Sequence, residues 1–128
     1  MQSDALCDQH PTHKVPVTSA CQIVLTTCPD AEIAGRIARA LVEERLAACV
    51  NILPPMRSVY RWKGQVEEAS EQLLVIKSVT AQFTALRDRL RALHPYELPE
   101  IVAVPIAHGL PGYLAWIAAE TTCDNPSC

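Results

Sequence analysis

The sequence has no excess of positive charge and few aromatic residues. Its 11 lysines and arginines are outnumbered by 14 acidic residues, which gives a formal net charge of −3. Binding to a phosphate backbone requires a basic face, so we expect no nucleic-acid partner. The arginine cluster at 87–91 alternates with Asp88 and leucines, as is typical of a solvated helix face. With one Phe, three Tyr and two Trp, the core must be aliphatic.

Long apolar runs and secretion signals are also missing. No stretch approaches the roughly 18 apolar residues that cross a bilayer, so we expect no membrane span. The N-terminus shows no charged start followed by an apolar segment, and we therefore expect a cytoplasmic protein.

The six cysteines contain no CxxC pair, which excludes the spacing of a structural zinc ribbon. In a protein that is not secreted they are expected to be free thiols. Cys7, Cys123 and Cys128 lie in the expected tails, where Cys7, His10 and His13 would hold a metal only loosely because ordering a flexible segment costs entropy.

The apolar pattern predicts one domain over residues 21–121, with tails at 1–20 and 122–128. Strands are expected at 21–27, 49–54, 56–62, 66–79 and 101–106, helices at about 29–47 and 80–94, and a short C-terminal helix after Gly112. This β-α-β-β-α-β order predicts an α+β, ferredoxin-like sandwich with two helices on one face of an antiparallel sheet.

Local signals place the ends of these elements. Pro29 suits the first position of a helix, and Thr80 suits an N-cap. Lys63 and Gly64 are typical of a tight turn in a long hairpin. Pro105 indicates a sheet edge or a bulge.

The uncovered face of the sheet and the long hairpin both predict self-association. The sheet is poor in polar residues on that face, and Tyr60 and Trp62 on the hairpin lie far from any core that one subunit supplies. We therefore expect both surfaces to be buried against other copies of the chain.

The segment from His94 to Glu100 contains an imidazole, a phenol and two carboxylates around two prolines. Proline restricts its neighbours, so the segment should be a stiff, extended connector. His94 is either a Cu or Zn ligand or a residue that ends the second helix near the negative end of its dipole. Glu97 and Glu100 either form an acid–base pair or bind basic or backbone groups of a neighbouring chain. No nucleophile–base arrangement accompanies them, and we expect no enzyme.

Four aromatic residues, Tyr60, Trp62, Tyr96 and Trp116, suit subunit interfaces or a ligand cleft between subunits. Lys77, at the end of an apolar strand, is a candidate partner for a carboxylate or an anion. Cys49, at the entry to a strand, is expected to be a core residue.

Several separated stretches resemble the CutA divalent-cation tolerance family. They are the runs Ala47–Ile52, Ser58–Gly64, His94–Ile101 and Tyr113–Trp116, which occur in the family's order. The resemblance covers about residues 21–121. It implies a ferredoxin-like subunit that forms a homotrimer and takes part in tolerance of copper and other divalent metals, without an established reaction or organic cofactor.

The resemblance also implies a metal site, from which this sequence departs. Some copper-binding members have a cysteine and a second histidine at the positions that Thr26 and Leu93 occupy here. Cys28, two residues after Thr26 along the strand, is the candidate substitute, so the predicted ligands of Cu or another divalent ion are His94 and Cys28. The alternative function is a small-molecule or anion-binding signalling trimer, with a cleft between subunits that uses Tyr60, Lys77, Tyr96 and Glu97.

Overall fold

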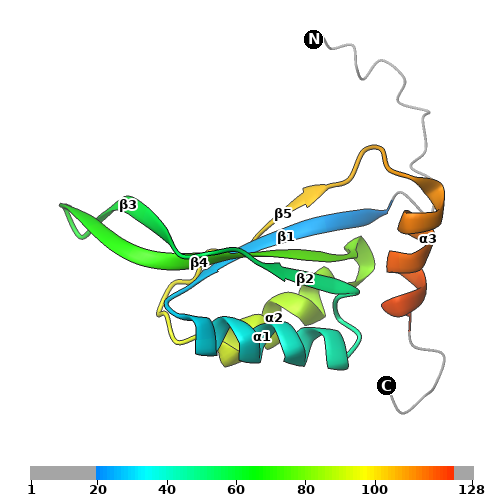
Figure 1. Ribbon diagram of the computed structural model, residues 1–128, viewed down its shortest axis with the longest axis horizontal. Helices are drawn as coiled ribbons and strands as arrows, with labels where there is room; N and C mark the ends of the chain where they lie inside the picture. Colours follow the sequence, from blue (N-terminus) through cyan, green and yellow to red (C-terminus); the bar gives the residue numbers. More distant parts are fainter. Residues whose placement is uncertain (1–19, 123–128) are drawn as a thin grey trace, which may run out of the picture.

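A sheet and two helices form two layers in the computed structural model, which describes residues 20–122, and a third helix lies against one end of the sheet (Figure 1). The elements within these residues are β1 Cys21–Cys28, α1 Ala31–Glu43, β2 Cys49–Ile52, β3 Met56–Trp62, β4 Gln65–Val79, α2 Phe83–Leu93, β5 Val102–Pro105 and α3 Pro111–Glu120.

The sheet is antiparallel, with the strand order β2-β4-β1-β5, and β3 pairs with the first half of β4. β2 and β3 share β4 as their partner and are separated at Pro54 and Pro55, which have no N–H to donate to a ladder. This arrangement confirms the predicted α+β, ferredoxin-like fold. β5 forms the edge beside β1, as Pro105 predicts.

The main core lies between the sheet and the pair α1 and α2, and it is aliphatic. Its largest fully buried side chains come from both helices and from β1 and β4: Val24, Ile37, Leu41, Leu74, Ile76, Leu86 and Leu90. In β1 the side chains of Val24, Thr26 and Cys28 are completely buried on this helix-covered face, because alternate strand residues share a face.

The first helix is shorter than predicted at both ends. Asp30 is its N-cap, since the carboxylate oxygen Oδ1 accepts a hydrogen bond from the Ile33 N–H at 2.9 Å. Pro29 therefore precedes the cap and does not occupy the first helical position. The helix ends at Glu43 because Arg45 adopts a positive φ of 61°, which turns the chain toward β2.

The start of the second helix was also predicted incorrectly. Thr80–Gln82 form a 3-10 turn, and α2 begins at Phe83 without a side-chain cap. The Thr80 hydroxyl donates to the carbonyl of Ala20 at 2.8 Å, so it ties the end of β4 to the start of β1. The sequence predicted that the Thr80 hydroxyl caps the helix, but in the fold this hydroxyl binds the backbone of a distant segment instead.

The β3–β4 hairpin forms as predicted. Lys63 and Gly64 are its two turn residues, and both have positive φ values, 51° and 81°. A turn with two left-handed residues matches the twist of paired strands, which explains why glycine stands at the second position.

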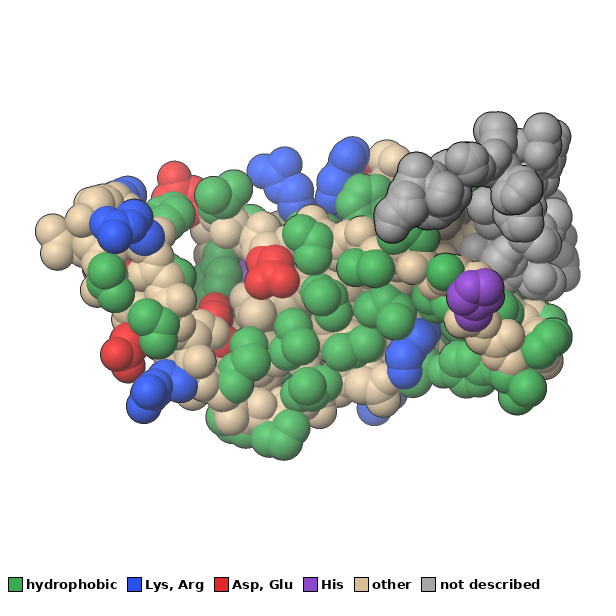
Figure 2. Space-filling view, turned by 90° about the horizontal axis from the view of Figure 1, so that it is seen from above, with side chains coloured by type: hydrophobic (Ala, Val, Ile, Leu, Met, Phe, Trp, Pro, Cys, Tyr) green, Lys and Arg blue, Asp and Glu red, His purple; other side chains and the backbone are tan. Residues whose placement is uncertain are grey.

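The sheet face opposite α1 and α2 is largely apolar and uncovered by other elements over its centre. Figure 2 shows this face with hydrophobic side chains across most of it. Leu25 and Val75 are opposite each other at its middle, and Val102 and Val104 of β5 are 47% and 50% exposed. A smaller cluster, Cys21, Leu114 and Ile117, covers the end of the sheet beneath α3.

Among the helices within residues 20–122, none is long and apolar enough to cross a membrane. Apart from Ala20 and Thr122, the predicted tails, with Cys7, His10, His13, Cys123 and Cys128, lie outside the described residues.

Candidate functional site

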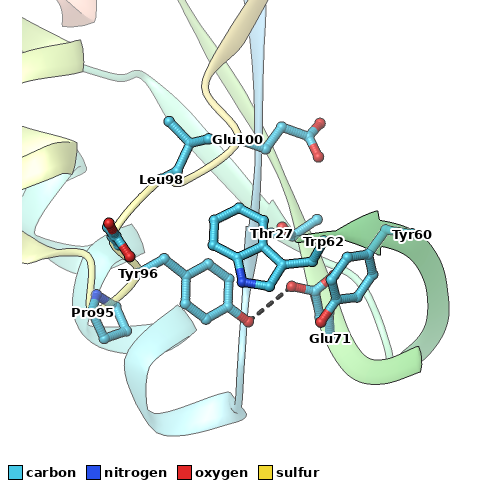
Figure 3. Close-up of a pocket in the computed structure, with 9 residues that line it drawn as sticks. Thr27, Tyr60, Trp62, Glu71, Pro95, Tyr96, Leu98 and Glu100 are labelled. Carbon is cyan, nitrogen blue, oxygen red and sulfur yellow. Dashed lines mark hydrogen bonds between the residues drawn. The ribbon is translucent and has the colours of Figure 1, made fainter. Parts of the chain in front are cut away.

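A cleft of about 510 Å³ lies between the hairpin and the connector that follows α2 (Figure 3). Its lining residues come from β1, β3, β4 and the connector: Thr27, Tyr60, Trp62, Glu71, Pro95, Tyr96, Glu97, Leu98 and Glu100. The sequence placed Tyr60 and Trp62 far from any core that one subunit supplies. Both are indeed exposed and belong to neither core cluster, and they line this cleft together with the connector of the same chain.

The connector is extended where it leaves α2, as its prolines predict. His94 has φ −84° and ψ 135°, and its side chain is buried. The ring nitrogen Nε2 lies 2.8 Å from the Thr27 carbonyl oxygen, and Nδ1 accepts the Tyr96 N–H at 3.2 Å. A carbonyl only accepts and an N–H only donates, so this pattern assigns the neutral imidazole with its proton on Nε2. His94 therefore fastens the connector to β1.

Tyr96 and Glu71 join the two walls of the cleft. The Tyr96 hydroxyl donates to the Glu71 carboxylate oxygen Oε2 at 2.8 Å, and Figure 3 shows the two side chains pointing toward each other. Burial and this bond to a carboxylate raise the pKa of Tyr96, so the phenol stays protonated and keeps donating. The His94 and Tyr96 rings are also in contact, with centroids 4.7 Å apart.

The cleft is acidic. Glu71, Glu97 and Glu100 line it, and the nine lining residues include no lysine, arginine or histidine. The four ion pairs found within residues 20–122 involve other carboxylates. Negative charge without local compensation favours a cation in this cleft and disfavours an anion.

Cys28, the second predicted metal ligand, lies at the same end of β1 as His94 but on the helix-covered face. Its thiol is fully buried and free. Burial, with smaller contributions from Asp30 and Glu71, raises the pKa of the Cys28 thiol from 9.0 to about 11. Thr26, at the position of the family cysteine, has a buried hydroxyl without a hydrogen-bond partner in the described part of the chain.

The raised pKa of Cys28 makes stability fall in alkaline solution. Between pH 9 and 11 the unfolded chain releases the thiol proton while the folded chain keeps it, so the free energy of unfolding decreases as pH rises. We expect Cys28 to contribute a loss of about 2 to 3 kcal/mol across this window. Urea unfolding of the wild type and of Cys28→Ala at pH 8 to 11 measures it, and equal pH slopes for the two proteins would contradict it.

Residues 20–122 contain no cluster of three or more His, Cys, Asp or Glu side chains that could hold a metal ion. His94 has both ring nitrogens in hydrogen bonds, so metal ligation there requires one of them to be released. Further ligands would have to come from a second copy of the chain, as the sequence also predicts, or from the tails.

The structure separates two predicted residues from the cleft. Lys77 lies on the open sheet face, where its ammonium contacts the Asn51 side chain, with Cys49 as its strand partner. Trp116 lies on α3, where its ring contacts that of Tyr113 in a tilted arrangement with a centroid distance of 5.5 Å. Neither residue lines the cleft. One chain therefore brings Tyr60, Tyr96 and Glu97 together but does not add Lys77 to them.

Sequence reasoning missed Glu71 and Thr27. Glu71 is one of three glutamates in the first half of β4, and nothing local distinguishes it from Glu67 and Glu68. The one signal is its position two residues before the continuous apolar run that starts at Leu73, where a carboxylate is placed beside the core.

The sequence matches the family model described as CutA1 divalent ion tolerance protein over residues 22–120. It is 55% identical over 100 residues to the divalent-cation tolerance protein CutA of Thermus thermophilus, covering 78% of this chain and 97% of that protein. It is 45% identical over 111 residues to human protein CutA, covering 87% of this chain and 62% of the human protein.

Solved structures agree with these sequence matches. A divalent cation tolerance protein from Thermus thermophilus superposes with a TM-score of 0.78 at 54% identity, covering 80% of this chain and 99% of that chain. CutA from Xylella fastidiosa gives a TM-score of 0.79 at 48% identity, covering 81% and 100%.

Proposed function

Because this chain belongs to the CutA1 divalent ion tolerance protein family, we propose that it is a non-catalytic homotrimer that binds copper or a similar divalent ion. The observation that carries the link to metal tolerance is the 55% identity to a divalent-cation tolerance protein over 97% of that protein's length. The family is described by tolerance and not by a reaction.

The apolar open face of the sheet supports the assembly. Half-exposed Val102 and Val104 and the central Leu25 and Val75 form a continuous surface of the kind that homo-oligomers bury. The exposed aromatic residues of the hairpin and of α3 extend the same argument to both ends of the sheet.

The placement of His94 and Cys28 supports a metal site near the end of β1. Imidazole and thiolate are ligands that Cu and Zn prefer, and the adjacent acidic cleft would attract a cation. A bound ion would have to displace the proton of the Cys28 thiol, whose pKa is raised to about 11 by burial. Two ligands from one chain leave the coordination shell of the ion incomplete, and a neighbouring subunit would supply the other ligands.

Metal titration of tag-free protein tests this site. We expect His94→Ala and Cys28→Ser each to weaken binding of Cu(I), Cu(II) or Zn(II) by at least about tenfold, because each removes one of few ligands. Calorimetric or spectroscopic titration measures stoichiometry and affinity.

The matched control is Cys49→Ser, which removes a free thiol from the start of β2, beside Lys77 and away from Cys28. Its affinity should equal that of the wild type. If neither His94→Ala nor Cys28→Ser changes affinity or stoichiometry, the metal site lies elsewhere.

We also propose a cytoplasmic location. Within the described residues Cys28 and Cys49 are free thiols, which suits a reducing compartment. One solved relative, the CutA of Archaeoglobus fulgidus, is named a periplasmic protein, so cell fractionation is the test of location for this chain.

The alternative, a small-molecule binding trimer, is favoured by one observation, the cleft beside Tyr96. Its volume of about 510 Å³ is within the range of ligand pockets. An anion would need Lys77 from a neighbouring copy, because the lining residues of one chain are acidic.

A further inference from the structure

The cleft between the hairpin and the connector combines carboxylates with aromatic faces. Tyr60, Trp62 and Tyr96 line it together with the three glutamates, and Figure 3 shows Trp62 in the middle, with Tyr96 and Glu71 on one side and Glu100 on the other. Figure 2 shows the same region as a hollow beside the hairpin, with acidic side chains near it. Aromatic faces attract cations through their quadrupole, so both kinds of lining group favour the same charge.

Glu71 is the carboxylate that the fold holds in place at the wall of the cleft. The residue is 9% exposed, and the one hydrogen bond that its carboxylate accepts within the described residues comes from the neutral Tyr96 hydroxyl, at Oε2. None of the ion pairs in that part of the chain includes Glu71. The other oxygen, Oε1, accepts no hydrogen bond within the described residues and is not fully buried, so it is open to the cleft and can accept a charge-assisted hydrogen bond from an ammonium group.

A single metal ion does not fit this arrangement within one chain. The side chains of Glu71, Glu97 and Glu100 do not converge into a cluster that could hold an ion, although all three line one cleft. Dispersed carboxylates around an aromatic surface suit a larger cation that spans the space between them. The wall of the cleft is also partly apolar, through Pro95 and Leu98, which suits an alkyl chain.

We propose that this cleft binds a small organic ammonium ion, an aliphatic amine or diamine. One ammonium group is held by Glu71, the alkyl chain lies along Tyr60 and Trp62, and Glu97 and Glu100 receive a second ammonium group when one is present. Tyr96 fixes the Glu71 carboxylate in place by its hydrogen bond. This ligand class is separate from the metal at His94 and Cys28 and does not depend on that proposal.

Calorimetry and thermal unfolding of the full chain with putrescine as the probe test this inference. We expect saturable binding and a rise in the unfolding midpoint, since a native-state ligand stabilises the fold. Butanediol, the neutral analogue of the same length, should give neither, and sodium chloride at equal ionic strength should give no saturable signal.

Three variants identify the site. Glu71→Gln should weaken putrescine binding by at least about tenfold, because it removes the buried charge and keeps the side-chain shape. Glu43→Gln removes the same charge from the exposed end of α1 and should leave affinity unchanged. Tyr96→Phe keeps the ring and the Glu71 charge but removes the hydrogen bond that fixes the carboxylate, so it should weaken putrescine binding by about threefold, less than Glu71→Gln does.

Circular dichroism and the unfolding midpoint without ligand show whether each variant folds. Absence of putrescine binding to folded wild type, or equal weakening by Glu71→Gln and Glu43→Gln, overturns the proposal. Zn(II) or Mg(II) binding that Glu71→Gln abolishes, with no amine binding, would assign the cleft to metal ions instead. If His94→Ala loses metal binding but still binds putrescine, the result concerns the metal site at His94 and supports a separate amine site in the cleft.

Discussion

Val75→Glu is expected to convert the protein from a particle of about 42 kDa, three chains of 14.0 kDa each, to a monomer. Val75 lies in the middle of the open sheet face, between Asn51 of β2 and Leu25 of β1. In the proposed trimer this position is covered by another copy. A carboxylate there would lose its water without gaining a partner, which costs several kcal/mol at each interface.

Size-exclusion chromatography with light scattering at micromolar concentration measures the mass. Val42→Glu is the control, because Val42 is an exposed valine on α1, on the opposite side of the sheet. It should leave the mass unchanged. A wild-type mass near 14 kDa, or a Val75→Glu protein that remains a trimer, would contradict the proposed assembly.

Replacing His94 by alanine is expected to lower the free energy of unfolding by about 3 to 4 kcal/mol. The imidazole is buried and bonds to the Thr27 carbonyl and the Tyr96 N–H at once. The pairing of β5 with β1 ends at Leu25. Two residues further along β1, the side chain of His94 provides the hydrogen bond to the Thr27 carbonyl. Its removal leaves a cavity and two backbone groups without partners.

Urea denaturation followed by circular dichroism measures the loss. His108→Ala is the control: this histidine is exposed in the loop before α3, and its replacement should change stability by less than about 0.5 kcal/mol. His94→Gln, whose amide nitrogen can reach the Thr27 carbonyl, should recover part of the loss. A cost for His94→Ala no greater than that of His108→Ala would show that the connector is held in another way.

The parts of the fold that sequence predicted are those with local causes. The turn at Lys63 and Gly64 requires positive φ values, and a glycine at the second position predicts such a turn from sequence. The continuous run at Leu73–Ile76 predicts a strand covered on both faces. The strand forms as part of β4, between β1 and β2, but within one chain only the face of Leu74 and Ile76 is covered and Val75 lies on the open face. The helix ends were predicted less well. The Thr80 hydroxyl could bond either to the first turn of the helix or to a distant backbone group, and it bonds to the carbonyl of Ala20.

The candidate site divides in the same way. The sequence identified His94, Tyr96, Glu97 and Glu100 because they are neighbours in one segment, and the hairpin aromatics because they alternate along one strand. It did not identify Glu71, whose bond to Tyr96 joins residues 25 positions apart, or the role of Thr27, which is 67 positions from His94. It also assigned Lys77 to a cleft between subunits; Lys77 does not line the cleft that one chain forms, so this assignment stays a prediction about the assembly.

The sequence by itself therefore determined the order of strands and helices, the stiff connector and the family, because periodicity, turn chemistry and motif order act over short distances along the chain. Only the tertiary structure decided that both His94 nitrogens are engaged, that Cys28 is a buried thiol with a raised pKa, and that the cleft is acidic. Hydrogen-bond partners, burial and net local charge depend on residues that meet through folding, and no window of sequence contains them.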